Sequence, residues 1–210
     1  MQRKLEPVVE QTILLHQELD ELWRDLPEPL SRRYLAVLGF SVILRQHVAS
    51  QVLLAQAGLD VPATTLVRPA YEALVRAIWC MGGADDEWIE RFLTPRPDVD
   101  LLGSETAMGP NVQRMLDQIE DKHPPHVHQM LVELKDQTWR AMHSYVHGGI
   151  RPFVQGLVGF REHEVTGVVM NANAMLVVAT DVVRMACGLS SPQLPGLQKK
   201  HAACLPPEKS

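Results

Sequence analysis

Prolines and glycines divide this sequence into long segments in which apolar residues recur with helical spacing. Prolines precede several segments, where a helix has no acceptor for its first backbone N–H groups: Pro7, Pro29, Pro62, Pro124 and Pro125. Glycines follow several segments and suit left-handed C-terminal caps: Gly58, Gly82, Gly83, Gly148, Gly149 and Gly188. The pattern predicts helices at about 7–25, 29–57, 62–81, 85–94, 110–121, 125–147 and 162–187, with loops at 95–109 and 148–161.

The positions of the glycines also argue against a β-sheet. The nearest candidate for a strand, residues 154–160, is interrupted by glycines. We therefore expect an all-α fold: one helical domain over residues 1–189, built as an antiparallel bundle of four to five long helices plus short ones. Residues 190–210 contain four prolines and end in charged residues, which predicts a flexible C-terminal tail.

Composition restricts the environment and the partners. The net charge of −5 argues against indiscriminate binding to nucleic acid but leaves room for a local basic patch. Three widely spaced cysteines without a CxxC pair indicate a reducing compartment and no disulfide framework. The longest uncharged run, 165–180, is shorter than the ~20 residues of a membrane span and contains Asn171 and Asn173. We expect a cytoplasmic protein without a membrane span.

The most distinctive segment is TWRAMHSYVHGG, residues 138–149. Arg140 and His147 are seven residues apart, about two helical turns, so they share one face with His143 and Ser144. We call these four residues the polar stripe. The two glycines that follow end the helix, which leaves His147 in its last turn, where the helix dipole favours a protonated imidazole.

The predicted helix at 62–81 carries charges among its apolar residues. Arg68, Glu72 and Arg76 recur every four residues and can form a ladder of ion pairs on a solvated face. Alternatively, Arg68 and Glu72 form a partly buried network beneath the polar stripe. Pro69 would kink or restart the helix and place Arg68 near a helix start. Both interpretations remain open from the sequence.

Two interpretations of the polar stripe involve no catalysis. The histidines could be ordinary surface groups or hydrogen-bonded core residues. They could also hold a metal ion, because His143 and His147 have the spacing at which one helix chelates zinc or nickel. That site would need a third ligand from elsewhere in the chain, with His47, His163 and Glu72 as candidates.

The third interpretation is acid–base chemistry on a phosphodiester. Cleavage of RNA by its own 2′-hydroxyl needs a base, an acid and a cation that offsets the extra negative charge on phosphorus. Histidine suits the proton transfers, and arginine suits the charge because it stays protonated and binds phosphate oxygens in pairs. Arg140 and His147 meet this requirement on one face, and a symmetric dimer would bring two such sets together across one groove.

Arg140, six further residues and His147 resemble the R-x(4–6)-H motif of HEPN-domain ribonucleases, all-helical proteins of toxin–antitoxin and antiviral systems. The resemblance implies an HEPN-like bundle whose active site forms where two protomers meet. It implies that Arg140 stabilises the transition state, that His147 is the general base or acid, and that His143 and Ser144 are supporting polar groups. The sequence departs from the pattern at Ala141, where many active members have a polar residue.

A second resemblance covers more of the chain, about residues 30–187. The segments LVRPAYEALVRAIW and MHSYVHGG resemble uncharacterised bacterial helical proteins of the DUF5677 and DUF6988 type. We expect Arg68, Glu72 and Tyr145 to support the polar stripe.

Together these observations predict an HEPN-like, metal-independent endoribonuclease of toxin or defence type that needs no cofactor. Its expected partners are RNA, a cognate antitoxin and a second copy of the chain. Two alternatives stay open: a non-catalytic helical dimerisation or interaction module, and a metal-binding bundle that uses His143 and His147.

Overall fold

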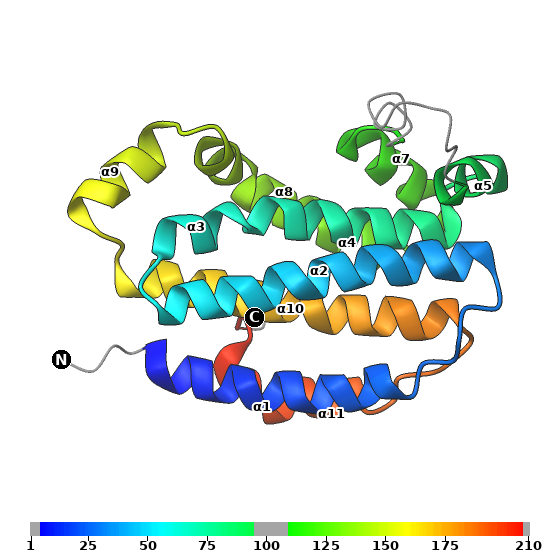
Figure 1. Ribbon diagram of the computed structural model, residues 1–210, viewed down its shortest axis with the longest axis horizontal. Coiled ribbons are helices and arrows are strands. Elements are labelled where there is room, and N and C mark those ends of the chain that lie inside the picture. Colours follow the sequence, from blue (N-terminus) through cyan, green and yellow to red (C-terminus); the bar gives the residue numbers. More distant parts are fainter. Residues whose placement is uncertain (1–4, 95–108, 208–210) are drawn as a thin grey trace.

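The computed structural model describes residues 5–94 and 109–207, and every regular element within these ranges is a helix (Figure 1). The prediction of an all-α fold is therefore confirmed. The elements are α1 (Leu5–Arg24), α2 (Arg32–Gln56), α3 (Asp60–Thr65), α4 (Val67–Gly82), α5 (Asp86–Leu93), α7 (Val112–Lys122), α8 (Pro125–Val146), α9 (Ile150–Val158), α10 (Glu162–Ala186), α11 (Leu194–Lys200) and the 3₁₀ turn η1 (Ala202–Cys204).

The long helices form a bundle in which α2, α4 and α10 pack against one another (Figure 1). The α1 helix packs against α10, while α7 and α8 pack against α4. Capping side chains fix where several helices begin. Ser31, Asp85 and Asn111 each accept a hydrogen bond from a backbone N–H in the first turn of α2, α5 and α7, respectively.

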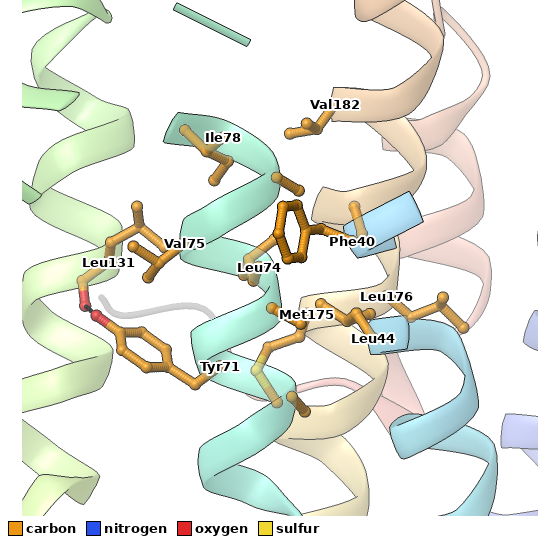
Figure 2. Packing of buried hydrophobic residues seen from close by; sticks show 14 of the residues in the cluster. Phe40, Leu44, Tyr71, Leu74, Val75, Ile78, Leu131, Met175, Leu176 and Val182 are labelled. Atoms are coloured by element: carbon orange, nitrogen blue, oxygen red, sulfur yellow. Dashed lines mark hydrogen bonds between the residues drawn. The ribbon is translucent and has the colours of Figure 1, made fainter. Parts of the chain in front are cut away.

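The centre of the core is α4, which positions α8. Leu74 and Ile78 of α4 are almost completely buried and lie among apolar side chains of α2 and α10, including Phe40 and Met175 (Figure 2). Tyr71 is fully buried, and its hydroxyl donates a hydrogen bond of 3.0 Å to the Leu131 carbonyl of α8 (Figure 2). This bond ties the helix that carries the polar stripe to the core.

The predicted helix at 62–81 is in fact two helices that meet at Leu66. Pro69 lies in the first turn of α4, where its missing N–H removes no intrahelical hydrogen bond. The helix restarts at Val67, and Arg68 stands near its beginning, as the position of Pro69 predicted.

The predicted loop at 148–161 contains a helix, α9. Gly148 and Gly159 bracket it with φ of 63° and 81°, values that glycine adopts without strain. Its internal Pro152 and Gly156 read as loop residues, but Pro152 lies in the first turn, where a helix tolerates it. No residue of α9 is buried.

The C-terminal residues correct the expectation of a flexible tail. Leu194, His201, Cys204 and Leu205 are buried, and η1 packs against α1 and α10. The His201 imidazole lies 2.9 Å from a carboxylate oxygen of Glu18 in α1. Arg184, itself buried, donates to the carbonyls of Leu22 and Ser190 and so fixes the chain that leads to α11. These contacts join segments far apart in sequence, so local composition gave no sign of them.

Two helices, α2 and α10, are long and apolar enough by composition to cross a membrane. In the structure, 56% of the apolar window of α10 is buried inside the bundle. Asn173, at its centre, is fully buried and hydrogen-bonded. The absence of a membrane span stays a prediction.

Candidate functional site

The polar stripe occupies the last turns of α8, and most of it faces outward. Arg140, His143 and His147 are exposed, and Ser144 is half-buried. Met142 and Tyr145, which alternate with these residues, are buried and anchor the opposite face of the helix. The sequence spacing therefore places the guanidinium and both imidazoles on one accessible surface.

The two imidazoles are in contact. The ring centroids of His143 and His147 lie 4.4 Å apart, as expected for successive turns of one helix. His147 is the C-terminal cap of α8, and its backbone N–H donates to the His143 carbonyl at 3.1 Å. A substrate that reaches one ring therefore also reaches the other.

Arg68 of α4 contacts the His143 imidazole of α8. Its Nη1 lies 3.3 Å from Nδ1 of His143, and its Nε donates to Glu72 at 2.8 Å. Its guanidinium also lies over the ring of Trp139, 4.7 Å from the centroid. Because arginine has only donors, Nδ1 of His143 is the acceptor, and the ring hydrogen resides on Nε2.

This geometry matches the second interpretation of the charges on α4, a partly buried network beneath the stripe. The Arg68 and Glu72 side chains are 22% and 31% exposed, respectively. Arg76, the third member of the proposed ladder, has its guanidinium over the Phe40 ring at 5.8 Å and also interacts electrostatically with Glu72.

Ser144 connects the stripe to α9. Its hydroxyl accepts a hydrogen bond of 3.3 Å from the backbone N–H of Arg151, and its carbonyl accepts one of 2.7 Å from Gly149. A Cβ at Gly149 would lie 2.5 Å from the Ser144 hydroxyl, so a larger residue there would displace that hydroxyl. The hydroxyl and the carbonyl of Ser144 therefore both bind the turn after His147.

Tyr145 supports the stripe by packing. Its ring stacks on Phe160 with centroids 6.1 Å apart, and burial raises the pKa of its hydroxyl. The raised pKa keeps the side chain neutral, which suits an anchor for the end of α8.

Arg140 differs from Arg68 in having a free guanidinium. It is exposed, and no acidic side chain among residues 5–94 and 109–207 pairs with it. Its backbone lies roughly 10 Å along the helix from that of His147, a distance that an arginine side chain and a bound phosphate can bridge. Arg140 therefore offers an uncompensated positive charge beside two imidazoles.

The polar stripe is mostly exposed and lines none of three hollows in the described part of the chain. Three hollows of about 440, 300 and 530 Å³ are lined by other residues. The first is an apolar groove between α8 and α10, the second lies beside α1, and the third is polar and lies between α5 and α7.

A metal site at the two histidines lacks a third protein ligand. Within the part of the chain that the structure describes, no three His, Cys, Asp or Glu side chains gather closely enough to hold an ion. Glu72, the candidate acidic ligand, forms an ion pair with Arg68.

Arg151 is a cation that sequence reasoning missed. It is exposed in the first turn of α9, directly beside Ser144. The sequence predicts a loop at 148–161, and a loop gives Arg151 no defined position relative to the stripe. The helical periodicity of the apolar residues that follow it was the available signal.

Comparison with known proteins identifies a family but no activity. Searches of curated proteins and of solved structures found no match to this chain. Residues 41–207 match the model of a family of unknown function, DUF6988, and this range contains the polar stripe, Arg68 and Glu72. The chain belongs to family DUF6988.

Proposed function

We propose that this protein binds RNA at the polar stripe and cleaves it by metal-independent acid–base chemistry, as HEPN-domain ribonucleases do. The observation that carries the proposal is the exposed Arg140 guanidinium, which has no ion-pair partner in the described chain and shares one face with His143 and His147. A phosphodiester carries the negative charge that this face attracts, and its cleavage needs proton transfers that imidazole performs near neutral pH.

In the proposed reaction the 2′-oxygen of a ribose bonds to the adjacent phosphorus, and the bond from phosphorus to the 5′-oxygen breaks. One group removes the 2′-hydroxyl proton, and another protonates the leaving 5′-oxygen. The products are a 2′,3′-cyclic phosphate and a 5′-hydroxyl, so no water or metal ion is consumed. His147 takes one of the two proton transfers, and Arg140 offsets the charge that develops on the phosphoryl oxygens.

His143 would position the substrate. Because Arg68 occupies its Nδ1, the Nε2–H is left to donate to a phosphate oxygen. Arg68 is accordingly a positioning residue, since it acts through His143 and is itself held by Glu72. The conservative change Arg68→Lys retains the charge but not the paired contacts, so we expect it to weaken RNA binding less than Arg140→Ala does.

The competing function is a non-catalytic interaction module. The observation that favours it is the exposure of Arg140, His143 and His147, which line none of the three hollows described above. A module of this kind would bind its ligand through the same cations and leave it intact. RNA that is bound but never cleaved would support this function over the ribonuclease.

Expression in a bacterial host tests the proposal. The wild-type chain should arrest growth and fragment cellular RNA, whereas Arg140→Ala and His147→Ala should do neither at equal protein levels. Arg114→Ala is the matched control, because Arg114 is also exposed but lies on α7. Identical growth and RNA integrity for all four proteins would remove the ribonuclease proposal. We also propose a cognate antitoxin as partner, and its co-expression should restore growth of the wild type.

A further inference from the structure

The α9 helix turns apolar side chains toward solvent. Its exposed apolar residues recur at helical spacing and form one face, which we call the α9 face. They are Ile150, Phe153, Val154, Leu157 and Val158, which are 70%, 63%, 42%, 74% and 77% exposed, respectively. An amphipathic helix normally directs this face toward its own core, so the orientation of α9 is reversed.

The side of α9 that carries Gln155 faces the bundle, and α9 packs against α8 and α3. Gln155 donates a hydrogen bond of 3.4 Å to Glu164 of α10, and the Arg151 N–H donates to the Ser144 hydroxyl. Figure 1 shows α9 at one end of the molecule, beyond the ends of the long helices. The α9 face therefore lies largely open to solvent, although α9 also contacts α3 and α8.

The area of the α9 face suggests a protein partner. The five side chains expose on the order of 500 Å² of apolar surface, which is at the upper end of the largest patches on ordinary monomers. If two copies covered each other, the contact would bury on the order of 1,000 Å², the lower limit of specific interfaces. We propose that the α9 faces of two copies pack against each other across a twofold axis.

A second copy fits the α9 face better than a lipid surface does. Helices that bind membranes combine an apolar face with several cations on the polar face, whereas α9 has nine residues and a single cation, Arg151. The chain as a whole carries a net charge of −5, which anionic lipids would repel. In a twofold contact the same surface of both copies must be complementary to itself. A purely apolar helical face meets this requirement.

The proposed contact stands independently of ribonuclease activity. It follows from the α9 face alone, and it would hold for a non-catalytic module. Because α9 begins only two glycines after His147, the contact would also place both polar stripes near the dimer interface.

Sedimentation velocity over a range of protein concentrations tests the proposal. We expect the wild type to dimerise, and the double variant Leu157→Asp/Val158→Asp to raise the dissociation constant at least ~100-fold, since each introduced carboxylate would be desolvated. Leu30→Asp is the matched control, because Leu30 is 94% exposed and lies in the connection between α1 and α2. A wild type that stays monomeric, or a dimer unaffected by the double variant, would overturn the proposal.

Crosslinking tests the contact separately, because the double variant could also weaken the dimer by unfolding α9. Val154 lies at the middle of α9, so in an antiparallel pair its side chain meets its own copy near the twofold axis. Val154→Cys should form a disulfide-linked dimer under mild oxidation, whereas Leu30→Cys should not exceed the wild-type level set by Cys187. Equal crosslinking of the two variants would contradict the proposal. So would α9-dependent binding of the monomer to vesicles of anionic phospholipid.

Discussion

Asn173 and the polar stripe both place polar groups on long helices, but Asn173 is buried and hydrogen-bonded whereas the stripe is mostly exposed. The Asn173 amide is buried, and it donates to the Thr12 hydroxyl at 2.8 Å and to the Cys204 carbonyl at 2.9 Å. Its oxygen accepts from Nε2 of His16 at 2.9 Å. Arg140, by contrast, is exposed and has no ion-pair partner in the described chain.

The contrast separates polar groups that stabilise the fold from those available to a ligand. A buried polar group must find its partners inside the protein, because leaving one unpaired costs about 1–3 kcal/mol. Asn173 uses its partners to join α1, α10 and the C-terminal residues. The Arg140 guanidinium makes no ion pair within the described chain, so it is available to a ligand. We therefore expect substitutions of Arg140 to change function and to leave stability almost unchanged.

The largest expected effect comes from removing the buried amide. Asn173→Leu should lower the free energy of unfolding by about 3 kcal/mol, because the Cys204 carbonyl and the His16 imidazole lose their partner. Urea denaturation followed by circular dichroism measures the change. Asn171→Ala is the control, since Asn171 is only half-buried, and its effect should stay within about 0.5 kcal/mol. Equal losses of unfolding free energy in Asn173→Leu and Asn171→Ala would contradict the distinction between buried, hydrogen-bonded polar groups and exposed ones.

A smaller loss is expected at the contact that ties α8 to the core. Tyr71→Phe removes the hydrogen bond to the buried Leu131 carbonyl and should lower the free energy of unfolding by about 1–2 kcal/mol. Tyr145→Phe removes a hydroxyl that makes no hydrogen bond within the described chain, so it should be nearly neutral in the same denaturation experiment. A loss at Tyr145 as large as that at Tyr71 would show that we have placed the anchor of α8 wrongly.

The half-buried histidines His16 and His47 should make the free energy of unfolding depend on pH. Burial lowers the pKa of His16 and of His47 below the ordinary value of 6.5. As pH falls below 6.5, the unfolded chain binds protons that the folded chain does not, so the free energy of unfolding should decrease. Denaturation at pH 7.5 and pH 5.5 measures the decrease, and His16→Gln should reduce it. A pH dependence of the same size in His16→Gln would exclude His16 as a source.

The smallest effect on stability is expected in the stripe itself. Arg140→Ala should change the free energy of unfolding by no more than about 0.5 kcal/mol. Arg184→Ala provides the contrast, because Arg184 is buried and donates to two carbonyls, and its loss should destabilise the fold measurably. A large loss of stability in Arg140→Ala would mean that the stripe has a structural role, contrary to our interpretation.

The long helices could be predicted from the sequence because their ends carry local signals. The segment predicted at 125–147 is Pro125–Val146 in the structure, and the one predicted at 162–187 is Glu162–Ala186. Pro124 and Pro125 begin the first, and Gly148 and Gly188 follow the two ends. The sharing of one helix face by Arg140 and His147 followed from spacing alone.

The remaining features depend on contacts that local sequence does not encode. The C-terminal segment is ordered by His201 and Glu18, which are 183 positions apart. Arg68 meets His143 across 75 positions, so the sequence left that network as one of two interpretations. The elements around α8 decide whether the stripe lies in a hollow. The spacing of residues along α8 does not predict which elements these are.

The most direct test of our account is the rate at which purified protein cleaves a labelled RNA in the presence of a metal chelator. We predict cleavage that leaves 2′,3′-cyclic phosphate ends, with a rate ~10²–10⁴-fold lower in His147→Ala. His126→Ala, which removes an exposed histidine at the other end of α8, should match the wild type. No cleavage by the wild type, or equal rates for the two histidine variants, would contradict the claim that the stripe acts on RNA.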